Sequence, residues 1–136
     1  MDIAEALAFI AVNHRGVLST QRADGRPALT PVTAAVDDAG RVIVSTRDTA
    51  MKVHNIRHDA YVSLVVMSDT FFGPWVQIEG PATVLELPDA IEPLVDYYRR
   101  VAGEHADWDD YRRAMIRDRR VLLQIEALRV GPTRSG

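Results

Sequence analysis

The sequence contains no cysteine, and only one of its 16 lysine and arginine residues is a lysine, Lys52. The missing cysteine excludes disulfides, thiolate metal sites and cysteine nucleophiles, and leaves nothing that argues for an oxidising compartment. A basic excess is missing as well, because the formal net charge is -3. This balance argues against a sequence-independent nucleic-acid binder.

Targeting signals and common catalytic motifs are also missing. The first twelve residues carry Asp2 and Glu5 where a signal peptide would have positive charge, so we expect a soluble, cytoplasmic protein with no membrane partner. No G-x-G-x-x-G, Walker or Gly-x-Ser-x-Gly pattern occurs. The length of 136 residues predicts a single domain over residues 1–130, followed by a polar tail over residues 131–136.

Hydrophobic periodicity predicts a mainly β chain with peripheral helices. Asp24-Gly25 supplies the positive φ of a tight hairpin, and Gly80-Pro81 is expected to bend a long strand. Antiparallel strands with few crossovers favour a closed or partly closed barrel over a doubly wound parallel sheet. The predicted helices are residues 2–13, about 49–58, 88–103 and 108–117, and the predicted strands are residues 16–20, 28–36, 41–45, 60–67, 75–80, 83–87 and 121–125.

Lys52 stands early in a predicted helix, shortly after a predicted strand. A compact ammonium in that position could bind a phosphate together with free backbone N–H groups. Mutational drift from lysine to arginine in a GC-rich genome could also leave a single lysine at any position of the chain. The position of Lys52 therefore carries more information than its rarity.

Other polar clusters have structural explanations that we favour. His54 and His58 lie four residues apart on one helix, but they are best explained as solvated, so no metal site is predicted. The acidic residues 104–110 suit a helix N-terminus. The arginines of residues 112–120 are interpreted as a solvated face or an ion-pair network rather than a polyanion site.

A few residues could together serve an anionic, planar ligand. Trp75 is the best stacking candidate, although a tryptophan at a strand entrance is usually core or interface. With Lys52, the strand-end hydroxyls of Ser45 and Thr46, and Asn55, it supports a site for some phosphorylated ring compound. These residues alone specify no reaction.

Nearly the whole chain resembles the flavin/deazaflavin oxidoreductases of the pyridoxamine 5'-phosphate oxidase-like split-barrel superfamily. The segment from Ala102 to Leu123 is similar to the actinobacterial deazaflavin branch, whose members use coenzyme F420. The segments that carry the resemblance are residues 16–20, 24–27, 45–52, 55–59, 77–80 and 102–123.

The resemblance implies a six-stranded antiparallel split β-barrel that forms a homodimer, with cofactor sites at the interface. Lys52 matches the phosphate-binding lysine, residues 30–33 match the strand along the ring system, and residues 73–75 match a segment that reaches over from the partner chain. The cofactor-binding residues expected on this basis are Lys52, Ser45, Thr46, Met51, Asn55, Thr30, Val32, Thr33, Gly73 and Trp75.

The chain departs from this resemblance near Lys52. Close relatives often carry arginine two residues before the lysine, where this chain has Ala50, and Thr-Arg-Asn where it has residues 53–55. Fewer fixed positive charges would weaken anion binding unless Arg47 or His54 substitutes.

The leading hypothesis is an F420-dependent reductase that transfers hydride between the deazaflavin ring and an unidentified small molecule. The alternatives are an FMN-dependent oxidase or reductase of the same fold, a non-catalytic F420-binding or carrier protein, and a purely structural dimer. No catalytic acid or base is assigned, because in cofactor enzymes the protein mainly positions and shields the reacting groups.

Overall fold

The computed structural model describes residues 1–131 of the chain and consists of strands with four helices. The helices are α1 (Ile3–Val12), α2 (Met51–His58), α3 (Ile91–Ala102) and α4 (Trp108–Arg117). The strands are β1 (Arg15–Gln21), β2 (Pro27–Val36), β3 (Val42–Arg47), β4 (Tyr61–Met67), β5 (Trp75–Leu85), β6 (Arg120–Ile125) and β7 (Arg129–Gly131).

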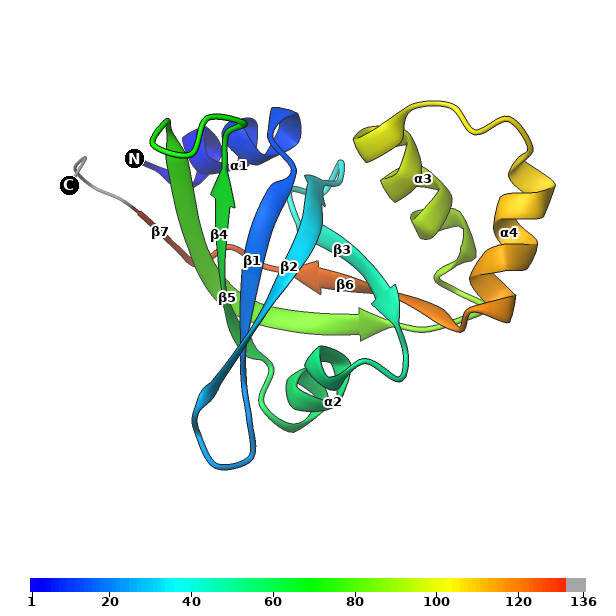
Figure 1. The fold of residues 1–136 in the computed structure, drawn as a ribbon, viewed down its shortest axis with the longest axis horizontal. Coiled ribbons are helices and arrows are strands. Elements are labelled where there is room, and N and C mark those ends of the chain that lie inside the picture. The colour runs from blue at the N-terminus through cyan, green and yellow to red at the C-terminus, as the bar shows by residue number, and fades with distance from the viewer. Residues whose placement is uncertain (132–136) are drawn as a thin grey trace.

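Six antiparallel strands close into a barrel in the order β4-β1-β2-β3-β6-β5, with β5 pairing back to β4. The two longest strands make this closure possible because each changes partner along its length. Residues 27–33 of β2 pair with β1 and residues 34–36 with β3, while residues 75–81 of β5 pair with β4 and residues 82–85 with β6. Figure 1 shows β5 curving from the side of β4 towards the end of α4. The predicted six-stranded antiparallel split barrel is confirmed.

Strand β5 changes its pairing partner directly after Gly80 and Pro81, where the sequence predicts a bend. At this point the chain after β6 crosses close to β5, and the N–H of Glu126 donates to the carbonyl oxygen of Pro81 at 3.0 Å. A Cβ atom added at Gly80 would overlap the carbonyl oxygen of Glu126. Only glycine permits this backbone approach without a shift.

Two apolar clusters hold the molecule together. The barrel interior is filled by fully buried side chains such as Leu18, Leu64 and Leu123. A second cluster, which includes Ile43 and Leu122, joins the outer face of the barrel to α3 and α4. In Figure 1 these two helices lie side by side on one flank of the barrel, away from α1.

Several element boundaries differ from the sequence predictions. Helix α2 starts at Met51 rather than near residue 49 and has no side-chain cap, because the carboxylate of Asp48 binds Arg57 at 2.7 Å and not the first amides of the helix. Residues 87–90 form a turn, and α3 starts at Ile91 rather than at Pro88.

The C-terminal end of the described chain also holds an element that the sequence analysis missed. Residues 129–131 pair with β5 as the short strand β7, so Gly131 belongs to the sheet rather than to a polar tail. The rest of the predicted tail, residues 132–136, lies outside the described residues. Within the described chain, no helix combines the length and the apolar character needed to cross a membrane.

The close approach at Gly80 predicts a large effect of a single methyl group. Replacing Gly80 with alanine should lower the free energy of unfolding by about 1–3 kcal/mol or more, because the new Cβ would force the β5 backbone away from Glu126. Urea denaturation followed by circular dichroism measures the change. Gly131→Ala is the matched control, because a Cβ there meets no atom within 4 Å. Equal stability of the two variants would contradict the prediction.

Candidate functional site

A cleft of about 850 Å³ lies between the barrel and the α3–α4 pair of the described chain. Its volume falls in the range of small-molecule and cofactor sites. Strands β1 to β4 and helices α2, α3 and α4 contribute to its walls, with one residue from the start of β6. The lining residues are Arg15, Gly16, Val17, Pro31, Val32, Thr33, Ser45, Thr46, Lys52, Met67, Tyr97, Tyr98, Tyr111, Met115 and Arg120.

Half of the cofactor-binding residues expected from the sequence meet in this cleft. They come from three separate elements, namely β2, β3 and α2, and are Val32, Thr33, Ser45, Thr46 and Lys52. Thr30 does not line the cleft, but it lies on the same strand β2, and its buried Oγ1 has no hydrogen-bond partner among the described residues.

The other expected residues lie outside the cleft. Met51 is exposed on α2. Asn55 is buried, and its Nδ2 donates to Thr20 Oγ1 at 3.1 Å, which ties α2 to β1. Gly73 lies in the turn between β4 and β5, and Trp75 opens β5. The single chain therefore does not bring the residues 73–75 to the cleft.

Lys52 is half-buried, and its ammonium is only loosely engaged by the protein. Nζ donates to Thr46 Oγ1 at 3.4 Å, which is long for such a bond. Burial lowers the pKa of Lys52 below its usual 10.5, and the positive charge of Arg120 lowers that pKa further. Both effects disfavour the charged ammonium, whereas an anion in the cleft would favour it.

The cleft is positively charged although the whole chain is acidic. Its lining includes three cations, Arg15, Lys52 and Arg120, and no aspartate or glutamate. Arg15 approaches Asp69 at 3.7 Å, but both side chains are exposed and such a pair contributes little. The two cations deeper in the fold, Lys52 and Arg120, have no salt bridge among the described residues.

Arg120 is a candidate site residue that the sequence did not predict, because it belongs to the run of arginines in residues 112–120 that resembles a solvated face. Four of them fit that interpretation and form salt bridges, namely Arg112, Arg113, Arg117 and Arg119. Arg120 instead lies in the cleft, and its buried Nε has no hydrogen-bond partner in the described chain. Strand alternation could have separated them, since Arg120 lies two residues before Leu122, on the face of β6 that meets α3 and α4.

Tyrosines from α3 and α4 form the wall opposite the barrel. The Tyr97 hydroxyl donates to the Thr33 carbonyl oxygen at 2.8 Å, and the Tyr111 hydroxyl donates to the Leu94 carbonyl oxygen at 2.9 Å. Burial raises the pKa of Tyr97, although the Ser45 backbone and the Arg120 charge oppose it. Burial, aided by Tyr97, raises the pKa of Tyr111 to about 12. Both phenols are therefore neutral near pH 7.

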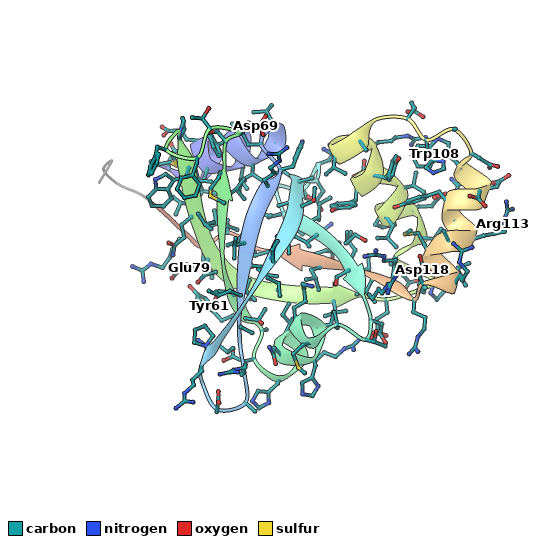
Figure 2. All side chains as sticks on the ribbon, in the orientation of Figure 1. Tyr61, Asp69, Glu79, Trp108, Arg113 and Asp118 are labelled. Atoms are coloured by element: carbon teal, nitrogen blue, oxygen red, sulfur yellow. The ribbon has the colours of Figure 1, made fainter. Side chains whose placement is uncertain are left out.

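An aromatic cluster supports this wall from behind. Tyr98 lies edge-on to Trp108 with ring centroids 5.7 Å apart, and Trp108 meets Tyr111 at 5.6 Å. Figure 2 shows Trp108 directed from α4 towards α3, whereas Arg113 points away from the molecule. Such edge-to-face packing stabilises the contact between α3 and α4 at the edge of the cleft.

The residues of the cleft suit one chemical class of ligand. Lys52, Arg120 and the hydroxyls of Ser45 and Thr46 are the donors that a phosphate prefers. Apolar side chains of β1, β2 and β4, including Val17 and Val32, form walls that a ring system could contact. The donor set therefore fits a phosphorylated ring compound.

The family model described as pyridoxamine 5'-phosphate oxidase matches residues 3–133 of this chain. Among solved structures, a conserved hypothetical protein of Mycobacterium tuberculosis, Rv2991, is similar over 100% of this chain and 92% of its own, with 29% identity and a TM-score of 0.78.

Two more distant structures share the fold. A protein described as an F420 reductase has 17% identity and a TM-score of 0.71, over 91% of this chain and 94% of its own. HutZ, described as a heme storage protein of Vibrio cholerae, has 13% identity and a TM-score of 0.71, over 96% of this chain and 94% of its own. At these identities the likeness concerns the fold alone.

The lowered pKa of Lys52 predicts that this residue destabilises the ligand-free protein. Lys52 has a lower pKa in the folded protein than its usual 10.5 in the unfolded chain, so between these two pKa values the unfolded chain binds more protons at Lys52. The free energy of unfolding of the wild-type protein therefore rises with pH through that range. Lys52→Met should therefore raise the free energy of unfolding at pH 7, and the difference from wild type should shrink as the pH approaches 10.5. Urea denaturation of both proteins across pH 7–10.5 measures this, and a pH-independent difference would contradict it.

Proposed function

Because the chain belongs to the pyridoxamine 5'-phosphate oxidase family, we propose that it is an oxidoreductase that uses a flavin-type cofactor, specifically coenzyme F420. The family binds flavin-type cofactors and includes oxidoreductases. The observation that carries the proposal is the lining of the cleft. Lys52 and the hydroxyls of Ser45 and Thr46 share this lining with apolar side chains, and no acidic residue belongs to it.

The choice of F420 rests on two supports. The segment from Ala102 to Leu123 resembles the deazaflavin branch, and it includes all of α4 and the first strand residues of β6. The fold is also shared with a protein described as an F420 reductase. FMN would use the same phosphate-binding side chains, so it is the competing cofactor.

The protein's part in the reaction is binding and orientation. When bound, F420 supplies hydride transfer at its deazaflavin ring, with an electrophilic small molecule as the acceptor and solvent as a source of the proton. Lys52 and Thr46 would hold the phosphate, Val32 and Thr33 would lie along the ring system, and the α3–α4 tyrosines would exclude water. Such positioning accounts for much of the rate enhancement in cofactor enzymes.

We also propose that two copies of the chain complete the site. Phe71 and Phe72 are 76% and 95% exposed in the turn between β4 and β5, and Trp75 follows them at the edge of the barrel. Exposed aromatic side chains grouped in this way are typical of protein interfaces. Residues 73–75 lie outside the cleft of their own chain, which suits a role in the site of the partner chain.

Fluorescence titration with F420 and, separately, with FMN tests the cofactor proposal. Saturable binding of F420, tighter than that of FMN, is the expected result, followed by turnover of electrophilic acceptors with the reduced cofactor. Tighter FMN binding would shift the proposal to flavin chemistry. F420 binding without turnover of a broad acceptor panel would favour a carrier protein.

Lys52→Ala should weaken F420 binding by about 1.5–3 kcal/mol, because it removes a charge-assisted contact to the phosphate. The same titration measures the loss. His58→Ala is a suitable control, because His58 is exposed on the same helix and does not line the cleft. An unchanged affinity of Lys52→Ala for F420 would show that Lys52 does not bind the cofactor.

Light scattering after size-exclusion chromatography tests the dimer. The particle formed by the wild-type protein should have about twice the mass of one chain, which is 15.1 kDa. The double variant Phe71→Ser, Phe72→Ser should be monomeric or weakly associated. A monomeric wild type would contradict the proposal. A double variant as dimeric as wild type would place the interface elsewhere.

A further inference from the structure

Arg120 is a cation of the cleft that forms no salt bridge with the described residues. It comes from the first position of β6, and it lines both the main cleft and a smaller hollow of about 410 Å³ beside it. Its Nε–H is buried and donates to no acceptor in the described chain. A buried donor left without a hydrogen bond is costly, so such a group calls for an explanation.

The immediate surroundings of Arg120 increase that cost. In the β3–β6 ladder the residue directly opposite Arg120 is Arg47, and like charges in that position destabilise a sheet. Lys52 is close enough for the Arg120 charge to lower its pKa. The carboxylate nearest in sequence to Lys52, Asp48, is occupied by Arg57 and Arg119, at 2.7 Å and 3.7 Å. The remaining titratable side chains that line the cleft are Arg15, Tyr97, Tyr98 and Tyr111. The smaller hollow adds the carboxylates of Asp48 and Glu86, and both of them bind Arg57.

Neutral phenols and further cations cannot compensate Arg120 and Lys52. A bound anion can do so, and an arginine adds a planar fork of donors that a lysine lacks. The two residues are 68 positions apart in the sequence and reach the cleft from different elements, so only the closed barrel brings them together.

We propose that Arg120 and Lys52 together bind the phosphate of the ligand in this cleft, with Arg120 supplying the positive charge that Ala50 does not. Arg47 and His54, the substitutes considered from the sequence, do not line the cleft. This inference deepens the proposed function and rests on it for the identity of the ligand, because the phosphate is taken to be that of the cofactor.

The single lysine of the chain makes a direct test possible. Lysine-selective ¹³C labelling gives the NMR signals of one lysine side chain, that of Lys52. Its Cε chemical shift, followed as a function of pH, reports the pKa of Lys52. Inorganic phosphate should raise this pKa in the wild-type protein. Arg120→Gln should raise the pKa of Lys52 in the ligand-free protein, because it removes a neighbouring positive charge. It should also weaken phosphate binding about ten-fold or more.

Arg119→Gln is the matched control, because Arg119 is the adjacent arginine, is exposed and pairs with Asp48. It should leave both the Lys52 pKa and phosphate binding near their wild-type values. Arg120→Lys should restore part of the phosphate affinity, since it keeps the charge but loses the planar fork. Circular dichroism of each variant verifies that the fold is intact.

Titration of the same variants with F420 and FMN separates this inference from the proposed function. F420 binding that is equal in Arg120→Gln and wild type would overturn the role of Arg120 and leave the proposed function standing. Loss of phosphate binding in Arg120→Gln, in a protein that binds neither F420 nor FMN, would support the two-cation site and overturn the cofactor assignment. An equal effect of the Arg119 and Arg120 substitutions on phosphate binding would reduce the inference to general surface charge and overturn it.

Discussion

The close approach of β5 to the chain after β6, permitted by Gly80, is the constraint on which the architecture depends. Because β5 bends there, its first half pairs with β4 and its second half with β6, and the sheet closes. Closure sets the end of β3 beside the start of β6 and leaves α2 and the α3–α4 pair on the outside (Figure 1). The cleft forms between these parts, so its geometry follows from the barrel rather than from any local motif.

The charges and unpaired polar groups of this cleft destabilise the ligand-free protein. Lys52 and Arg120 are partly buried near one another with no acidic neighbour in the lining, and Thr30 and Arg120 keep buried polar atoms without partners in the described chain. Elsewhere the same chain pairs its charges in salt bridges on the surface. Functional sites often hold such unfavourable arrangements, because the ligand supplies the missing interaction.

Periodicity and turn chemistry predicted most of the fold. The Asp24-Gly25 hairpin, the bend at Gly80 and the helical order could be read from local pattern, because each depends on a few neighbouring residues. The start of α2 was missed since Asp48 binds Arg57 instead of the helix amides, and this choice depends on tertiary contacts. The strand β7 has only three residues, too few for a periodic signal.

The site was only half predictable for the same reason. Lys52, Thr46 and Ser45 are close in sequence and stood out together, whereas Arg120 is distant and was hidden among neighbouring arginines that form surface salt bridges. The α3–α4 tyrosines became part of the cleft only through the packing of those helices on the barrel.

A crystal structure of the protein with F420 would be the sharpest test of the two-cation phosphate site. We expect the cofactor phosphate within hydrogen-bond distance of both Lys52 Nζ and the Arg120 guanidinium, with the ring system along Val32 and Thr33. A phosphate bound away from both cations, or an F420 molecule outside the cleft, would contradict that expectation.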